Sequence, residues 1–150
     1  MLRIGVDDLT SFRHEHRMAG HGIPVSKGVM ARSYRELVVW QKAKALAVHT
    51  YAATANFPRA ETYGLTSQIR RSSVSVASNI AEGQGRLTRG EFRHFLGQAR
   101  GSLLEAETQL AIARDLGFLE QNAFASLDEE SYRVLGLLDR LLSSLQRMPA

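Results

Sequence analysis

The segment from Gln68 to Gly83 constrains the fold more than any other part of the chain, because this helix-length run contains almost no large side chains. At 100° per residue, one side of such a helix is an apolar stripe facing a core. The stripe consists of Leu65, Ile69, Ser72, Val76 and Ile80. A helix that is apolar or small over most of its circumference is usually covered on more than one side. The segment therefore predicts a helix packed among bundle neighbours or against another subunit.

The two other sides of this helix are polar and small. The polar side carries Arg71, Ser75, Ser78, Asn79 and Glu82, and the remaining side carries Arg70, Val74, Ala77 and Ala81. A catalytic role for the polar row is disfavoured, because serine needs an activating base and no His or Asp lies at helical spacing. We instead predict a structural seam in which hydrogen bonds and opposite charges hold subunits together. Its members are Arg71, Ser75, Asn79, Glu82, Val74, Ala77 and Ala81.

The length of 150 residues and the absence of cysteine limit the function classes. The length suits one domain with a core of its own, and the lack of cysteine excludes disulfides, thiol catalysis and cysteine metal sites. No apolar run reaches the ~18 residues that cross a bilayer, and the N-terminus lacks a signal-peptide core. We expect a cytoplasmic protein without a membrane partner.

The net charge of +4 is unevenly distributed along the chain. Residues 65–104 contain six arginines and two glutamates, whereas residues 105–139 contain eight acidic residues and two arginines. This asymmetry favours either an anionic partner on one surface or head-to-tail contacts between subunits.

Capping and stop signals predict the first two helices. Ser33 and Glu36 form a capping box, and the helix that follows ends before Phe57-Pro58. Its predicted core side is Leu37, Trp40, Ala43, Leu46 or Ala47, and Tyr51. The second helix runs from about residue 61 to residue 82, with Gly83 as its left-handed C-terminal residue.

The third helix begins at a Thr88–Glu91 capping box and ends at Leu116, followed by Gly117. The fourth begins near Asn122 or at Ser126 and ends near residue 146. Short loops between four long helices predict an all-α fold, a single antiparallel up-down-up-down four-helix bundle over residues 33–150. Residues 1–32 show no sustained period and predict a flexible, disordered tail, with Met30 as an alternative start of translation.

Several ordered motifs resemble a known family. They are LVVWQKA at 37–43, FP at 57–58, YGLTSQIRRSSVSVASNIAEG at 63–83, GR at 85–86, EFRHFL at 91–96 and GSLLEAETQL at 101–110. In this order they resemble the four-helix-bundle proteins encoded in intervening sequences of bacterial 23S ribosomal RNA genes. The resemblance covers about residues 34–145.

The resemblance implies a ring-like homopentamer without a defined activity. A related branch, the accessory proteins of diversity-generating retroelements, implies binding of nucleic acid and of a reverse transcriptase through a basic surface. One departure from the family is RRSSVSV at 70–76, where the family often has RRAAVSI. The added hydroxyls keep the side chains small but weaken the expected contact.

Arginines are the candidate nucleic-acid contacts. Arg89, Arg93 and Arg100 share one side of the third helix, and Arg86 precedes them. Arg70 and Arg71 are weaker candidates, because they lie toward the other end of an antiparallel helix pair. The alternative is a solvated face with local ion pairs. No aromatic residue alternates with these arginines, so the pattern does not support base stacking.

A metal site is the remaining alternative. Glu91 and His94 have the Glu-x-x-His spacing of di-iron bundles, but the second such motif and the further inward carboxylates are missing. We therefore expect no metal, no cofactor and no catalytic residue. The expected function is a non-enzymatic, oligomeric scaffold that binds RNA or DNA nonspecifically. The competing hypothesis is a protein-interaction module that docks a polymerase or another protein without touching nucleic acid.

Overall fold

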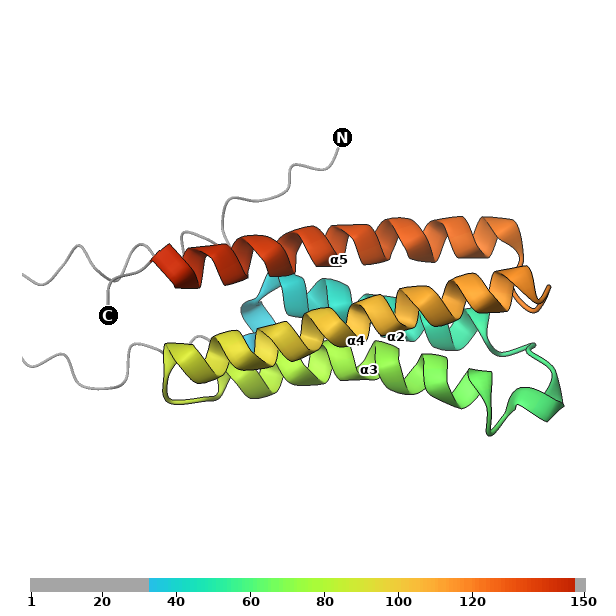
Figure 1. Cartoon of the computed structure of the whole chain (residues 1–150), viewed down its shortest axis with the longest axis horizontal. Helices are drawn as coiled ribbons and strands as arrows, with labels where there is room; N and C mark the ends of the chain where they lie inside the picture. The colour runs from blue at the N-terminus through green and yellow to red at the C-terminus, as the bar shows by residue number, and fades with distance from the viewer. Residues whose placement is uncertain (1–32, 148–150) are drawn as a thin grey trace, which may run out of the picture.

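Four long helices joined by short connections form the part of the chain that this computed structural model describes, residues 33–147. They are α2 (Val38–Ala53), α3 (Leu65–Gln84), α4 (Arg89–Asp115) and α5 (Gln121–Arg147), with short 3-10 turns η2 (Tyr34–Glu36) and η3 (Arg59–Glu61). Successive helices run in opposite directions (Figure 1). The all-α four-helix bundle is confirmed. The predicted tail, the Met30 start and the last three residues of the predicted bundle lie outside the described residues.

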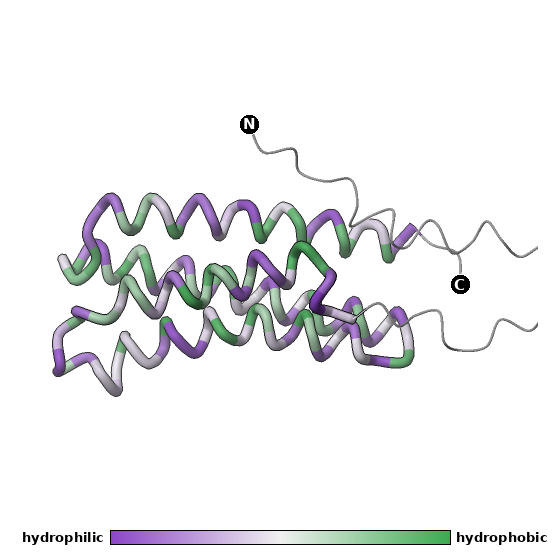
Figure 2. The backbone as a smooth tube through the Cα atoms, turned by 180° about the vertical axis from the view of Figure 1, so that it is seen from behind, coloured by the Kyte–Doolittle hydropathy of each residue, from purple (hydrophilic) through white to green (hydrophobic). Residues whose placement is uncertain are grey.

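Each helix packs against two others, in the cyclic order α2, α3, α4, α5. Hydrophobic and hydrophilic residues alternate along every helix (Figure 2), as expected when one side of each helix faces the core. The largest fully buried apolar side chains come from all four helices. They include Leu46, Ile69, Ile80, Leu96, Leu103, Leu110 and Leu138. Between residues 33 and 147, no helix has the length and apolarity required to cross a bilayer.

The starts of the first two helices differ from the prediction. Ser33 caps only the 3-10 turn η2, by accepting a hydrogen bond from the Arg35 N–H, and the extended backbone of Leu37 separates this turn from α2. Helix α3 begins at Leu65, whose N–H donates to the Glu61 carboxylate at 3.0 Å. A side chain in the preceding turn therefore satisfies the first free donor of α3.

Gly83 was predicted as the residue that ends the second helix, and this is wrong. It is a buried residue inside α3, which continues to Gln84. A Cβ atom added to Gly83 would lie 2.6 Å from the Phe95 Cβ and 3.0 Å from a ring carbon of Phe92. Glycine is required here because α4 approaches closely, and not because the backbone turns left-handed.

The predictions for α4 are confirmed. The Thr88 hydroxyl accepts a hydrogen bond from the Glu91 N–H at 3.2 Å and donates to its carboxylate at 2.8 Å, which makes the capping interaction. Gly117 follows the helix in the left-handed region, with φ 77°. Helix α5 begins one residue before the earlier of the two predicted starts, so Ser126 lies inside it.

Candidate nucleic-acid interface

Arg86 and Arg89 lie where α3 turns into α4. The Arg86 guanidinium forms an ion pair with Glu82 one turn earlier and lies 4.5 Å from the ring centroid of Phe95. Arg89 is the half-buried first residue of α4. The charge of Arg86 is therefore partly neutralised within the chain, which reduces what it can contribute to an anionic ligand.

Arg100 and Arg70 have partners on other helices. The Arg100 Nε donates to the Asp139 carboxylate of α5 at 2.8 Å. The Arg70 Nε donates to the Thr54 hydroxyl at 2.9 Å, and its guanidinium lies 4.6 Å from the ring centroid of Tyr51. Both arginines connect helices. Tyr51, predicted in the core, is instead 46% exposed beneath Arg70, so that prediction is wrong.

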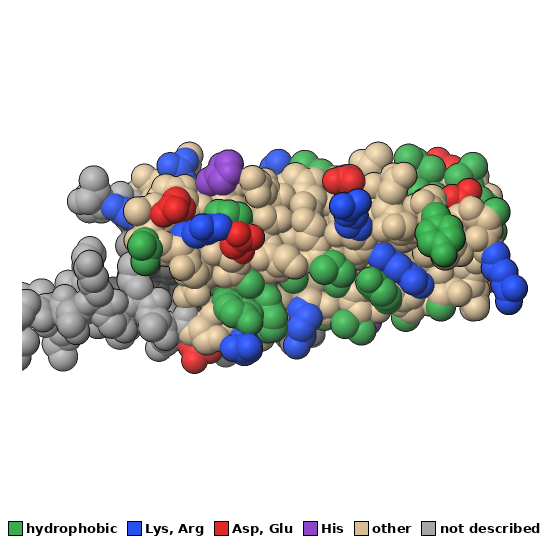
Figure 3. Space-filling model, turned by 90° about the horizontal axis from the view of Figure 1, so that it is seen from below, with side chains coloured by type: hydrophobic (Ala, Val, Ile, Leu, Met, Phe, Trp, Pro, Cys, Tyr) green, Lys and Arg blue, Asp and Glu red, His purple; other side chains and the backbone are tan. Residues whose placement is uncertain are grey.

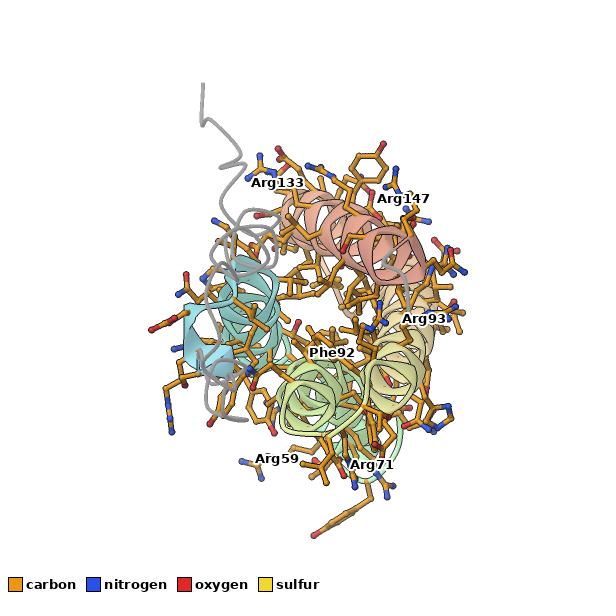
Figure 4. All side chains as sticks on the ribbon, turned by 90° about the vertical axis from the view of Figure 1, so that its left-hand side faces the viewer. Arg59, Arg71, Phe92, Arg93, Arg133 and Arg147 are labelled. Carbon is orange, nitrogen blue, oxygen red and sulfur yellow. The ribbon has the colours of Figure 1, made fainter. Side chains whose placement is uncertain are left out.

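Arg93 is one of two predicted site residues, with Arg71, that stay available to a ligand. It is exposed on α4 and makes no ion pair or hydrogen bond with another described residue. The Arg100–Asp139 bond sets the alignment of α4 and α5, so Arg93, about two turns before Arg100, lies level with Arg147 about two turns beyond Asp139. Figure 4 shows both side chains on this side of the bundle. We call Arg93, Arg147, Arg86 and Arg89 the basic end.

Arg71 lies apart from the basic end. It is exposed on α3 and has no hydrogen-bond or ion-pair partner among residues 33–147. The Ser75–Ser102 hydrogen bond aligns α3 with α4, which places Arg71 and Arg93 about 20 Å apart along the bundle. The two side chains also point in different directions in Figure 4. The six predicted arginines therefore do not form one continuous row, and Figure 3 shows basic side chains spread along the molecule, several beside acidic ones.

The predicted seam on α3 divides into two groups. Ser75 and Asn79 face α4 of the same chain: the Ser75 and Ser102 hydroxyls are 3.0 Å apart, and the Asn79 amide donates to the Ser75 hydroxyl at 3.0 Å. These two residues therefore have hydrogen-bond partners without a second subunit. The other members are Arg71 and Val74, which are exposed, Glu82, which pairs with Arg86, and the half-buried Ala77 and Ala81. A subunit contact through this second group stays a prediction.

Two acidic residues of α4 and α5, Glu107 and Asp128, lie away from the basic end, where the two helices meet. Burial raises the pKa of the half-buried Glu107, the negative charge of Asp128 raises it further, and the positive charge of Arg100 opposes the increase. Glu105 accepts a hydrogen bond from the Gln109 amide at 3.1 Å, and Gln109 in turn accepts from the Ser72 hydroxyl at 2.7 Å. The uneven charge along the sequence thus corresponds to separate basic and acidic regions of the folded molecule.

The Glu91–His94 pair has local partners. Glu91 takes part in the cap with Thr88, and His94 Nε2 is 3.0 Å from the Gln98 amide nitrogen. Within residues 33–147, no three His, Cys, Asp or Glu side chains gather in a way that could hold a metal ion. The absence of catalytic residues and of cofactors stays a prediction.

Sequence reasoning missed exposed arginines outside α3 and α4, among them Arg59 in η3 and Arg140 and Arg147 in α5. The Arg147 Nε donates to the Ser143 carbonyl at 3.3 Å, which leaves its terminal nitrogens free to bind a ligand. The apolar stripe of α5 could have identified Arg140, because Arg140 lies on the opposite side of the helix from the buried Leu138 and Leu145.

Comparison with known proteins agrees with the fold. Residues 35–140 match the family described as 23S rRNA-intervening sequence protein. Among solved structures, the chain is similar to a protein of unknown function from the S23 ribosomal protein family of Bacteroides thetaiotaomicron VPI-5482. The two share 24% identity with a TM-score of 0.64, over 70% of this chain and 98% of the other. No curated protein matches the sequence.

Proposed function

Because the chain belongs to the 23S rRNA-intervening sequence protein family, we propose that it is a non-enzymatic, oligomeric scaffold that binds RNA or DNA nonspecifically. The observation that carries the proposal is the basic end, where Arg93 and Arg147 are exposed at the same level of neighbouring helices. Neither side chain forms an ion pair with a described residue, so both charges can meet phosphates.

The chemistry of the basic end favours contact with the nucleic-acid backbone. Arginine binds phosphate oxygens through its planar fork of N–H donors, and such contacts carry no sequence information by themselves. The ring of Phe95 is covered by the Arg86 guanidinium and is not free to stack on a base. Binding through arginines alone should release counterions and therefore weaken steeply as salt rises.

Self-association multiplies this surface, because every copy adds its own basic end. Exposed apolar side chains on the outward sides of α3 and α4 support self-association. They are Val74, Leu104 and Ile112, which are 41%, 37% and 45% exposed. A second copy could cover them. Repeated phosphate contacts then raise the affinity for a long polyanion above that of one subunit.

The test is a salt titration of binding to a DNA duplex and to a structured RNA, followed by fluorescence anisotropy. The Arg93→Glu/Arg147→Glu variant should lose most binding at low salt, and its remaining affinity should depend less steeply on salt. The matched control is Arg59→Glu/Arg140→Glu, which makes the same charge change outside the basic end. Equal losses in the two variants, or no binding by the wild type at low salt, would contradict the proposal.

The competing hypothesis is an interaction module that docks a protein and does not touch nucleic acid. Affinity capture of partners with and without nuclease separates the two functions. A partner bridged by RNA should be lost after nuclease treatment, whereas a directly docked protein should stay bound. Retention of the same partner by the Arg93→Glu/Arg147→Glu variant would favour the interaction module.

A further inference from the structure

Two carboxylates lie near each other where α4 meets α5. The Arg100–Asp139 bond aligns the two antiparallel helices, so Glu107, about two turns after Arg100, lies level with Tyr132, about two turns before Asp139, and Asp128 lies one turn further along α5. Glu107 of α4 is half-buried, and the charge of Asp128 on α5 adds to the effect of burial in raising its pKa. Neither carboxylate forms an ion pair with a described residue. Arg100, which also acts on Glu107, is already bonded to Asp139 at 2.8 Å. A cation from outside the chain would relieve this repulsion.

Tyr132 completes this site. It follows Asp128 by one helical turn, so the two side chains lie on the same side of α5. Tyr132 is 76% exposed and its ring has no contact with a cation or another ring among residues 33–147, whereas five other aromatic rings in this part of the chain each carry a cation. Two carboxylates beside a bare aromatic face are suited to a guanidinium, which accepts both ion pairing and stacking. We call Glu107, Asp128 and Tyr132 the acidic–aromatic site.

The outward side of α3 offers the complementary groups. Arg71 is exposed and has no hydrogen-bond or ion-pair partner in the described part of the chain, and Val74, about one turn further, is 41% exposed. The exposed neighbours Ser67 and Ser78 are small, so another surface can approach the backbone of α3 here. Arg71 and Val74 lie about 4.5 Å apart along α3, and Asp128 and Tyr132 lie about 6 Å apart along α5, so the two pairs of side chains have similar spacings.

We propose that Arg71 of one copy of this chain binds between Glu107 and Asp128 of a neighbouring copy, with Val74 against the ring of Tyr132. The proposal rests on the self-association proposed above and identifies its two surfaces. Arg71 projects from the side of the bundle away from α5 (Figure 4), so the two surfaces of one copy are different and the contact is head-to-tail. Such contacts build a ring when the rotation between copies closes.

The test measures the mass and the dissociation constant of the assembly for the full chain, by light scattering after gel filtration and by analytical ultracentrifugation. Arg71→Glu places three like charges together and should raise the dissociation constant at least about a hundredfold. Glu107→Lys/Asp128→Lys should have a similar effect. The triple variant, which carries all three reversals, should assemble again because the charges are complementary once more. High salt should weaken the wild-type assembly.

Two controls separate this contact from general effects. Arg140→Glu makes the same charge change on the outer side of α5 and should leave the mass unchanged. Circular dichroism should show the helix content of the wild type in every variant, because none of the replaced side chains is fully buried. Tyr132→Ala should weaken the assembly about tenfold, and Tyr132→Phe should keep most of the affinity, since the proposed contact with Val74 uses the ring and not the hydroxyl.

The possible outcomes distinguish this contact from the proposed function. Wild-type mass in Arg71→Glu would overturn the assignment of the two surfaces and leave self-association standing. Failure of the folded triple variant to assemble would also overturn it. A wild type that is monomeric at all concentrations would remove both self-association and this contact. Successful rescue by charge exchange, together with a wild type that binds no nucleic acid, would support the contact and reject the nucleic-acid function.

Discussion

The α3–α4 pair and helix α5 contribute to the same core with different side chains. Helix α3 meets α4 through small residues, with Gly83 against Phe95 and the Ser75 hydroxyl 3.0 Å from that of Ser102. Helix α5 instead buries a row of large apolar side chains. These are Leu127, Val134, Leu138, Leu141 and Leu145.

The buried serines of the two regions also differ. The Ser72 hydroxyl of α3 donates to the Gln109 side-chain oxygen of α4 at 2.7 Å. The Ser131 hydroxyl of α5 is fully buried and has no hydrogen-bond partner among the described residues. Small side chains on α3 therefore permit a close, hydrogen-bonded helix pair, whereas α5 is held in the bundle by the burial of large apolar side chains. The two regions should therefore respond to opposite kinds of substitution.

The largest expected effect is on the leucines of α5. Leu138→Ala should lower the free energy of unfolding by about 2–5 kcal/mol, because it leaves a cavity where a fully buried side chain was. Urea denaturation followed by circular dichroism measures the change. Leu87→Ala in the turn between α3 and α4, where the residue is 93% exposed, is the control and should cost less than about 1 kcal/mol. Equal costs would contradict the described burial.

The next prediction concerns two glycines, one in α3 and one in α4, whose replacement by alanine should change the stability in opposite directions. Gly83→Ala should destabilise by about 1–3 kcal/mol, because the new Cβ would overlap the Phe95 Cβ, which cannot rotate away. Gly101→Ala meets nothing within 4 Å and should stabilise by up to about 1 kcal/mol through helix propensity. Thermal unfolding of both variants measures the difference. Stabilisation by both would show that α3 and α4 are further apart than described.

The buried serines give a smaller effect, again of opposite sign. Ser72→Ala should cost about 1–2 kcal/mol, because the side-chain oxygen of the buried Gln109 loses its donor. Ser131→Ala should be neutral or stabilising, because it removes a buried hydroxyl without a partner. Chemical denaturation of the two variants provides the test. A loss of stability in Ser131→Ala would reveal a hydrogen bond that the described packing lacks.

The smallest effect concerns Glu107 and depends on pH. This prediction is made for a chain that already carries Arg71→Glu, the change expected to prevent assembly. In that chain, Glu107→Gln should raise the free energy of unfolding at neutral pH by less than about 0.5 kcal/mol, because the carboxylate is partly solvated. Burial and the charge of Asp128 raise the pKa of Glu107 in the folded protein. The free energy of unfolding is therefore higher while Glu107 is protonated, at low pH, and falls as the pH rises through that pKa. The gain should therefore vanish below about pH 4. A gain that persists there would contradict this electrostatic origin.

Local signals in the sequence determined the number, order and type of the helices. The Thr88–Glu91 cap and the left-handed Gly117 were predictable because their partners lie within a few residues. The core side of α3 was predictable for the same reason, since the 3.6-residue period alone assigns Ile69, Val76 and Ile80 to one side. The family could also be identified from the order of short motifs over residues 35–140.

Only the tertiary structure decided how the polar and small residues are used. Arg100 bonds to Asp139 and Arg70 to Thr54, and neither partner could be chosen from the sequence, where each is more than a dozen residues away. Glycine is the residue type typical of a helix end, but Gly83 lies inside α3, where the close approach of α4 requires a residue without a side chain. Helical periodicity assigns a residue to a side of its own helix. The register and distance of the neighbouring helix then decide whether its charge is neutralised inside the chain or left for a ligand.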